Sequence, residues 1–416
     1  MTLAMSGNAA IKPIEGLKVL DLTKVLAGPI CTQALASLGA EVIKVETIGG
    51  GDETRFWPPV SHGVGAAFIS VNSGKRSIVL DLKAPEAREI VLKLAADADV
   101  IIESFAPGVA AKLGVDHDTL TAGRQNVICC SISGWGQRGP KAAAPGYDAV
   151  LQAYSGMMSM NGEPSRQPVR LPGSPIDQVT GLYATQAILA ALLQRGRTGK
   201  GARLEVSLLE SAIKLLAPNL QAYWQSGSVP VRSGSGHPSV VPYEVFETAD
   251  RPLLMAIANE KFWRLFCKVA DREVWLDDPR FRTNPDRVKN RDELIPLVAG
   301  RMTSLTADAW TAKLDAAGIP ASTLHSIADI ADSPQAEALG IYRTMVHPDL
   351  GEIKAVCEPI LYDGQRAISD RPPPILGQHG REILMNDLGY CEEMVTRLAA
   401  EGIVQLPPQT ESGVTA

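Results

Sequence analysis

The strongest constraint on the fold is a strand–helix–strand pattern at the beginning of the chain. Leu17–Leu22 and Glu41–Glu46 are short apolar runs, and a helical stretch opened by a Gly-Pro pair and closed by a glycine separates them. A helix between two strands predicts a parallel pair with a right-handed crossover. The functional edge of such a unit lies where the strands end, which places Thr23–Ala27 and Glu46–Gly51 at that edge.

The same alternation continues through the first half of the chain. A helix rich in acidic residues, lysine and alanine precedes two apolar runs typical of buried strands, and a long apolar helix precedes a further strand. These segments are Pro85–Ala96, Asp99–Ser104, Asn126–Ser133, Val179–Leu193 and Arg203–Ser207. The pattern predicts an α/β fold with a doubly wound sheet. The Gly-, Pro- and Ser-rich stretch Gly134–Pro175 is expected to wrap over its edge.

A change of composition after about residue 225 predicts a second domain. A loop-rich segment is followed by alternating amphipathic helices and short strands, and a proline-rich tail with a final helix then returns to the first domain. The predicted organisation is a large domain over residues 13–225, a glycine-rich link over 226–239, a small domain over 240–330, and a linker and return to the large domain over 331–416.

Composition narrows the function classes. The 416 residues carry a net charge of −6, which argues against binding nucleic acid, because phosphates demand a basic face. We expect no membrane span, since no apolar run approaches the thickness of a bilayer. Met1–Lys12 lacks a secretory signal, so the chain is expected in the cytoplasm. The six cysteines and six histidines lack metal-ligand spacing, which predicts free thiols and no metal site.

Glu46 stands at the end of the second predicted strand, where dinucleotide-binding folds carry a ribose-binding carboxylate. The glycine fingerprint that should accompany it is missing, because the turn after the first strand reads T-K-V-L-A-G-P and holds one glycine. A nicotinamide or flavin enzyme is therefore a weak alternative. The nucleophile elbow of serine hydrolases and the lysine pattern of the phosphate-binding loop are absent too.

Asp177 is the chemistry-bearing residue that remains. It stands in L-P-G-S-P-I-D-Q-V-T-G, immediately ahead of the long apolar helix, where an aspartate most often caps the helix. Capping and catalysis are compatible, because a helix N-terminus is expected to lower the pKa of a carboxylate and keep it ionised. Such a carboxylate can attack an acyl carbonyl, and coenzyme A thiolate can reopen the resulting mixed anhydride.

Four motifs follow one another along the chain: L-D-L-T-K-V-L-A-G-P at Leu20–Pro29, G-A-E-V-I-K-V-E at Gly39–Glu46, N-S-G-K-R-S-I at Asn72–Ile78 and S-I-S-G-W-G-Q-R-G-P at Ser131–Pro140. Together they resemble the class III CoA-transferase family, which includes formyl-CoA transferase, carnitine CoA-transferase and the α-methylacyl-CoA racemases. The resemblance implies a large Rossmann-like domain built from both chain ends, a smaller α+β domain, and a homodimer of interlocked chains.

The resemblance also implies roles for single residues. The family's catalytic aspartate falls on Asp177, and an aromatic residue beside its active site falls on Tyr147. Coenzyme A is implied to contact Leu26, Ala27, the segment Leu80–Lys83, Ser104, Phe105 and Lys112, and the glycine loop that covers the intermediate falls on Gly234, Gly236 and His237. Taken alone, the two lysines are ordinary surface charges and the loop is an ordinary linker.

Two departures from the family pattern bear on the reaction. Formyl-CoA transferase has a glutamine where this chain has Leu26, which argues against formyl or oxalyl specificity. The racemases need a histidine base where this chain has Tyr147, and a tyrosine hydroxyl is a far weaker base than an imidazole. The racemase interpretation is weakened accordingly.

The sequence therefore predicts an acyl-CoA:carboxylate CoA-transferase that works through an aspartyl anhydride and an aspartyl-CoA thioester. Its substrates are expected to be an acyl-CoA and a dicarboxylic or hydroxy acid, with no prosthetic group. Arg55 or Arg170 is a candidate for binding the distal carboxylate, although surface ion pairing is the ordinary role of such arginines. An acyl-CoA racemase or epimerase and a non-catalytic CoA-binding protein remain as alternatives.

Overall fold

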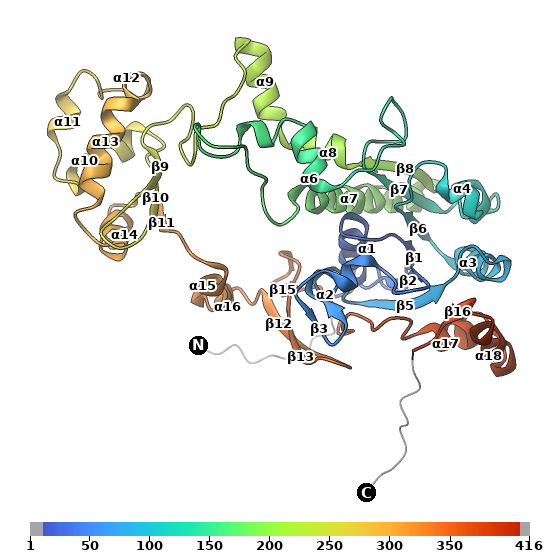
Figure 1. Cartoon of the computed structure of the whole chain (residues 1–416). Helices are drawn as coiled ribbons and strands as arrows, with labels where there is room; N and C mark the ends of the chain where they lie inside the picture. Colours follow the sequence, from blue (N-terminus) through green and yellow to red (C-terminus); the bar gives the residue numbers. More distant parts are fainter. Residues whose placement is uncertain (1–10, 408–416) are drawn as a thin grey trace, which may run out of the picture. The chain divides into compact units, whose positions relative to one another are not determined.

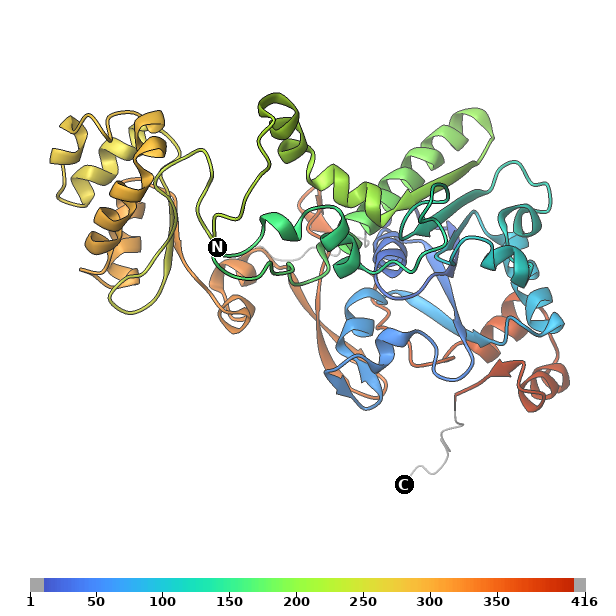
Figure 2. The ribbon, with the colours of Figure 1, turned by 45° about the horizontal axis from the view of Figure 1, so that its top comes forward.

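The computed structural model describes residues 11–407, so Met1–Ala10, most of the segment tested for a secretory signal, lie outside it. The described residues form two compact units (Figures 1 and 2). Unit 1 takes in the described residues up to Ser155, then Pro172–Pro218 and everything from Leu339 onward. Unit 2 consists of Gly156–Leu171 and Asn219–Ala338. Unit 1 is thus assembled from both ends of the chain.

The units divide the chain at other residues than the predicted 225, 239 and 330. Gly156–Leu171, assigned to the large domain on sequence, belongs to unit 2. The reason is a long-range contact: the Gly234 N–H donates to the Gly162 carbonyl at 3.1 Å, and Arg232 donates to the carbonyls of Glu163 and Pro164. Local composition carries no signal for such a pairing.

A seven-stranded sheet forms the centre of unit 1, in the order β16-β5-β2-β1-β6-β7-β8. Every neighbouring pair is parallel except β16 with β5. The strands are β1 (Lys18–Leu22), β2 (Glu41–Thr47), β5 (Lys75–Leu80), β6 (Val100–Glu103), β7 (Ile128–Ser133), β8 (Ala202–Ser207) and β16 (Val404–Gln405). The strand order reverses between β1 and β6, and ligands of such sheets bind outside the strand ends at that switch point.

Helices cover both faces of the sheet (Figure 1). On one face, α3, α5 and α18 share a buried core with Leu20, Ile78 and Ile101. On the other, α1 and α7 pack against each other and against the strands. The helices of unit 1 are α1 (Ala27–Ser37), α2 (Ala66–Val71), α3 (Pro85–Asp97), α4 (Val109–Leu113), α5 (His117–Thr121), α6 (Asp148–Tyr154), α7 (Pro175–Thr198), α8 (Leu208–Leu215), α17 (Gly380–Glu382) and α18 (Glu392–Ala400).

Short elements complete unit 1. They are the 3₁₀ turn η1 (Glu53–Phe56), the π-helical turn η3 (Ile383–Asp387), and the strand pairs β3 (Val60–Ser61) with β4 (Val64–Gly65), β12 (Tyr342–His347) with β13 (Gly351–Val356), and β14 (Leu361–Tyr362) with β15 (Gln365–Arg366). Helix α9 (Ala217–Ser226) begins in unit 1 and continues in unit 2.

Helix α7 departs from the prediction in two ways. It begins at Pro175 rather than Val179, so Asp177 lies inside its first turn instead of ahead of it. Its 24 residues are also long and apolar enough to cross a membrane by length and composition, contrary to the expectation that no such run exists. The helix packs on α1, β7 and β8, and Ile176 and Ile188 are fully buried there. Burial in a core explains this apolar composition as well as a membrane does.

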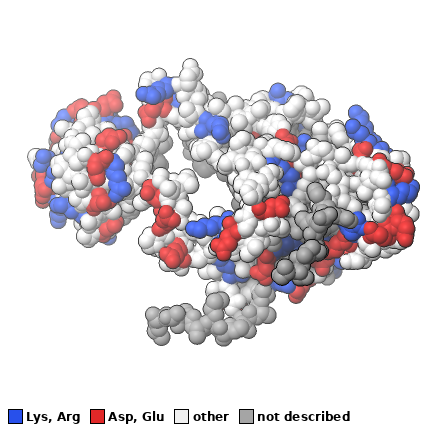
Figure 3. All heavy atoms as spheres, turned by 60° about the horizontal axis from the view of Figure 1, so that its bottom comes forward, with Lys and Arg blue, Asp and Glu red and all other residues white. Residues whose placement is uncertain are grey.

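Unit 2 is built on an antiparallel sheet in the order β11-β10-β9, packed by helices around Trp263 and Trp310. Figure 3 draws one face of the whole chain, on which acidic and basic side chains are interspersed. The elements of unit 2 are η2 (Met158–Met160), β9 (Tyr243–Phe246), β10 (Leu253–Ala256), α10 (Glu260–Val269), α11 (Val274–Asp277), α12 (Asn284–Lys289), α13 (Arg291–Met302), α14 (Ala307–Ala316), β11 (Ala321–Thr323), α15 (Ile327–Ala331) and α16 (Pro334–Ala338).

Candidate active site

The turn between β1 and α1 lies at the switch point of the sheet. The Lys24 N–H donates to the Ser104 hydroxyl, which directly follows β6, at 3.1 Å. Leu26 is the N-cap residue of α1 and Ala27 is its first residue. The structure therefore brings three of the predicted coenzyme A contacts, Leu26, Ala27 and Ser104, to the edge where ligands of this fold bind.

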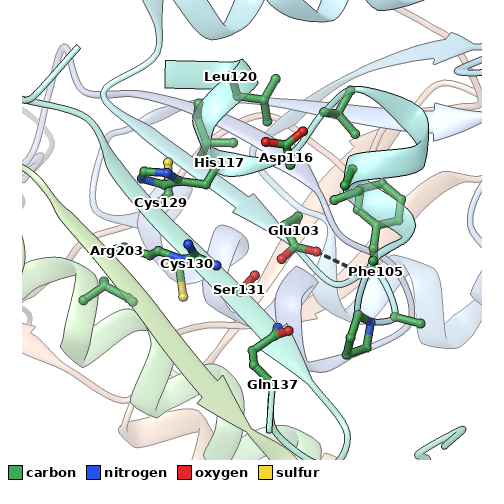
Figure 4. A pocket seen from close by; sticks show the side chains of 18 residues that line it. Glu103, Phe105, Asp116, His117, Leu120, Cys129, Cys130, Ser131, Gln137 and Arg203 are labelled. Atoms are coloured by element: carbon green, nitrogen blue, oxygen red, sulfur yellow. Dashed lines mark hydrogen bonds between the residues drawn. The ribbon is translucent and has the colours of Figure 1, made fainter. Parts of the chain in front are cut away.

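Two cavities lie near the end of β6, and Phe105 lines both. The smaller, of about 60 Å³, lies over the ends of β1 and β2, between Thr23, Lys24 and Ser104. The larger, of about 190 Å³, lies over β6, β7 and β8 and is drawn in Figure 4. The larger cavity is also lined by residues of α4 and α5, so only the smaller one lies at the strand ends.

The larger cavity contains the carboxyl group of Glu103, whose pKa is raised above its ordinary value. The Phe105 N–H donates to Glu103 at 2.7 Å, the contact dashed in Figure 4, and Arg203 lines the same cavity. Burial raises the pKa of Glu103 to about 7, against the opposing effects of that hydrogen bond and of Arg203. Sequence reasoning missed Glu103, because a glutamate at a strand end gives no sign of its burial.

The remaining predicted coenzyme A contacts are less uniform. Leu80 is the last residue of β5, and its side chain is fully buried in the core. Lys83 and Lys112 are exposed, one just beyond β5 and one on α4. Among the described residues, neither lysine side chain forms an ion pair.

Asp177 is the third residue of α7 and is 8% exposed. Its neighbour is a second carboxylate: Asp148, the first residue of α6, accepts the N–H groups of Ile176 and Asp177 at 2.7 and 3.1 Å. No hydrogen bond or ion pair reaches the Asp177 carboxylate among the described residues. Asp148 therefore caps α7, and the Asp177 side chain is left without a partner.

In this arrangement the pKa of Asp177 is shifted upward, opposite to the predicted direction. Burial, and then the charge of Asp148, raise its pKa to about 7, where the helix N-terminus was expected to lower it. The expectation was wrong because Asp148 takes the free amide groups of the first turn. Sequence reasoning missed Asp148, although it directly follows Tyr147 in P-G-Y-D-A-V and opens a helix, a place where aspartate commonly caps.

Tyr147 is the N-cap residue of α6 and its side chain is half exposed. Its hydroxyl donates weakly to Glu53 at 3.5 Å, and the other oxygen of Glu53 lies 3.3 Å from Lys24 Nζ. The two predicted catalytic residues are thus linked through Asp148, which follows Tyr147 in the chain and binds the backbone of Asp177.

The start of α1 also lies against α7. A Cβ added to Gly181 would lie 2.7 Å from the Ala27 carbonyl oxygen. Gly181 is one helical turn after Asp177, so both lie on the same side of α7. Asp177, Tyr147 and the β1–α1 turn consequently belong to one region of unit 1.

Arg55 does not have the place expected of it. It is 2% exposed, and its guanidinium makes two hydrogen bonds to Glu46, at 2.7 and 2.8 Å, besides stacking over Phe68. Neither a surface ion pair nor a substrate carboxylate is consistent with this burial. The same contact removes Glu46 as a ribose ligand. Arg170 is exposed in unit 2.

The predicted glycine loop lies in unit 2. Gly234 has a φ of +60°, which glycine adopts without strain, and its Cβ position is blocked by Glu163. His237 stacks on Tyr243, and Arg291 donates to the His237 carbonyl while pairing with Glu244. Gly236 follows the turn closed by the Ser233 carbonyl. The loop is thus an ordered turn rather than a plain linker.

A doubly wound sheet with an unpartnered buried carboxylate beside its strand ends fits covalent acyl transfer, and the comparison with known families makes the class explicit. The chain belongs to CoA-transferase family III, whose model matches residues 14–380, and it is a CoA-transferase.

Named relatives extend over nearly the whole chain. The succinyl-CoA:glutarate CoA-transferase of Mus musculus is 38% identical over 95% of this chain and 91% of its own length. The succinate–glutarate CoA-transferase of Agrobacterium fabrum is 37% identical over 89% of this chain and 95% of its own. A CAIB/BAIF family protein from Brucella suis has a similar crystal structure, with a TM-score of 0.81 and 36% identity over 90% of this chain and 99% of its own.

Proposed function

We propose that this protein transfers coenzyme A from succinyl-CoA to a dicarboxylic or hydroxy-dicarboxylic acid, through covalent intermediates on Asp177. Two relatives at 37–38% identity are named for succinyl and glutarate substrates, which supports this substrate class. The observation that carries the chemistry is the Asp177 carboxylate, buried and without a partner beside the strand ends.

In the first half-reaction an Asp177 carboxylate oxygen attacks the thioester carbonyl of succinyl-CoA. The C–S bond breaks, coenzyme A leaves as the thiolate, and a succinyl–aspartyl anhydride remains. The thiolate then attacks the aspartyl carbonyl, which releases succinate and leaves an aspartyl-CoA thioester. Splitting the transfer in this way replaces one difficult step by two easier ones.

The second half-reaction runs the same steps in reverse with a new acid. A carboxylate oxygen of the acceptor attacks the aspartyl thioester, which releases the thiolate and forms the acceptor–aspartyl anhydride. The thiolate attacks the acceptor's acyl carbon, giving the new acyl-CoA and free Asp177. Atoms and charges balance, so no further reactant is needed.

The surroundings of Asp177 suit a nucleophile of this kind. A carboxylate without hydrogen bonds has no donor to lose before it attacks, and burial keeps water from the anhydride. Tyr147 would bound the acyl site, and the exposed Lys83 and Lys112 suit the phosphates of coenzyme A. The glycine loop at Gly234 and Gly236, with His237, remains a proposed cover for the intermediate. With Arg55 buried, Arg170 remains as the proposed partner of a distal carboxylate.

We also propose a homodimer. The part of unit 1 that carries α6, α7 and α8 exposes more large apolar side chains than a lone surface needs. They are Val150, Tyr154, Leu182, Leu193, Ile213 and Leu215. Sedimentation equilibrium at micromolar concentration tests the dimer, and a monomeric mass would contradict it.

The six cysteines are all free thiols, which supports a reducing, cytoplasmic location.

The reaction is tested by incubating the protein with succinyl-CoA and single acids in deuterated buffer. Mass spectrometry of the acyl-CoA products reports transfer, and we expect glutaryl-CoA or a related dicarboxylyl-CoA to form only when its acid is present. If no acid accepts coenzyme A, a branched acyl-CoA is incubated with the protein in the same buffer; deuterium at its α-carbon would make the protein a racemase, and the proposal fails. Binding of coenzyme A without either reaction would indicate a non-catalytic protein.

A further inference from the structure

The turn between β1 and α1 contains a residue in a disfavoured conformation. Val25 has a φ of +69°, in the left-handed region that β-branched side chains rarely adopt. A valine stays there only when its surroundings hold it, because the extended and right-handed regions are lower in energy. Some group next to the turn must therefore fix it.

Asp52 is that group. The Val25 N–H points at both carboxylate oxygens of Asp52, at 3.2 Å each. The same carboxylate accepts the Thr54 N–H and hydroxyl, at 3.0 and 2.8 Å, which fixes the side chain at the start of η1. Asp52 is 3% exposed, so water does not compete for these contacts.

Lys44 holds the other side of the turn. Its ammonium is fully buried, lies 3.0 Å from an Asp52 carboxylate oxygen, and donates to the Thr23 carbonyl at 2.8 Å. One buried ion pair thus binds the carbonyl before Lys24 and the amide after it. The turn is held on both sides of Lys24, by Lys44 of β2 and by Asp52 at the start of η1.

The position of the turn matters for the site. Lys24 lines the smaller cavity at the switch point, and the Ala27 carbonyl lies against α7 one turn from Asp177. A shift of the turn would move the wall of the cavity and the approach to Asp177 together.

Asp52 and Lys44 also line the smaller cavity. We infer that Asp52, together with Lys44, is a positioning residue for the CoA ester: it holds Val25 so that Leu26 and Ala27 form the binding wall. This inference rests on the proposed function. Without the contacts of Asp52 and Lys44, only a fraction of molecules would hold the turn in its binding conformation. The apparent Kd for coenzyme A would then rise by the inverse of that fraction.

The test is the Kd of the full-length chain for coenzyme A, measured by calorimetry for the wild type and Asp52→Asn. Asparagine keeps one acceptor but loses the charge that holds Lys44, and we expect the Kd to rise about tenfold. The matched control is Asp99→Asn. Asp99 also pairs with a cation, Arg195, and accepts a β1 amide, that of Lys18, at the opposite end of the same strand. We expect no change in Kd for this control.

A rescue separates positioning from general damage. In the double variant Val25→Gly with Asp52→Asn, glycine adopts a positive φ without strain, so the turn depends less on the contacts of Asp52 and Lys44. We expect the double variant to recover most of the tenfold loss. If the Kd of the double variant equals or exceeds that of Asp52→Asn, the inference is overturned.

A measurement on the unmodified protein covers the case in which Asp52→Asn fails to fold. Hydrogen exchange at the Val25 amide in the ligand-free wild type should be strongly slowed by Asp52, and exchange at the rate of an open chain would overturn the inference. A wild type that binds no coenzyme A removes the proposed function and this inference with it. A wild type that binds it as tightly as Asp52→Asn removes the inference alone.

Discussion

Unit 1 buries carboxylates in two different ways. In and beside β1, β2 and β5, three carboxylates meet three cations in a charge network formed by Asp21, Lys44, Glu46, Asp52, Arg55 and Lys75. At the start of α7, Asp177 and Asp148 lie together, and no cation among residues 11–407 pairs with either. Both places are desolvated, and they differ in what stands opposite the negative charge.

The acidities follow that difference. Burial alone would raise the pKa of Asp21, but Lys75 and Lys44, with hydrogen bonds from Thr23 and Thr32, lower it to about 2. Glu46 and Asp52 are likewise lowered by their cations against burial. Asp177 has no such partner, and its pKa rises to about 7. Paired charges build the edge of the sheet, and the unpaired one is available for chemistry.

The largest expected effect comes from removing the unpaired carboxylate. Asp177→Ala should lower kcat for CoA transfer by a factor on the order of 10⁴ or more, because no other group can carry the acyl chain. Steady-state rates with succinyl-CoA and the best acceptor measure it. A variant that keeps a tenth of the wild-type rate would move the nucleophile elsewhere.

Breaking the paired network should cost stability instead of chemistry. Lys75→Met leaves Asp21 buried without its nearest cation, and the free energy of unfolding should fall by about 3 kcal/mol. Urea denaturation followed by circular dichroism measures it. The control is Lys18→Met, which breaks the exposed pair with Asp97 and should cost less than about 1 kcal/mol. Equal losses in the two variants would contradict the assigned importance of burial.

At Asp177, by contrast, removing the charge should raise the free energy of unfolding. The pKa of Asp177 is raised from 3.8 to about 7 on folding, so the ionised form lowers stability as pH rises from about 4 to above 7. Asp177→Asn removes that charge. At pH 8 it should therefore raise the free energy of unfolding by about 1–3 kcal/mol, and at pH 4 it should change it little. Thermal melts at both pH values check this, and a destabilised variant at pH 8 would refute it.

The smallest effect concerns the pH dependence of the rate. Only ionised Asp177 attacks, so kcat/KM for succinyl-CoA should rise with pH through a midpoint near 7 and level off above it. Asp148→Asn keeps an acceptor for the helix amides but removes the neighbouring charge. The midpoint should then move down by about one pH unit. An unchanged midpoint would show that burial alone sets the acidity of Asp177.

The regular elements could be predicted from the sequence because their signals are local. The predicted strands at Leu17–Leu22 and Glu41–Glu46 differ from β1 and β2 by one residue at an end, since buried parallel strands are continuous apolar runs. Asp177 could be singled out because it stands at the start of a long apolar helix. The contact of Gly234 with Gly162 could not, because it joins segments far apart in the chain.

The ion pairs and the pKa values of the site residues could not be predicted from the local sequence pattern. Arg55 looks like a surface arginine in G-D-E-T-R, and only the fold places it on Glu46. The acidity of Asp177 depends on which group takes the amides of the first turn of α7, and that group, Asp148, comes from another helix. Burial and opposing charge are properties of the packed chain, so residue types alone predict which groups are present but not their pKa.

The most direct test of the central claim is intact mass spectrometry of the protein after incubation with succinyl-CoA, with hydroxylamine added to trap an activated carboxyl group. The account predicts a covalent adduct and a hydroxamate that map to Asp177, that are absent in Asp177→Ala, and that persist in Asp99→Asn. An adduct on another residue, or glutaryl-CoA formed by the Asp177→Ala protein at the wild-type rate, would contradict it.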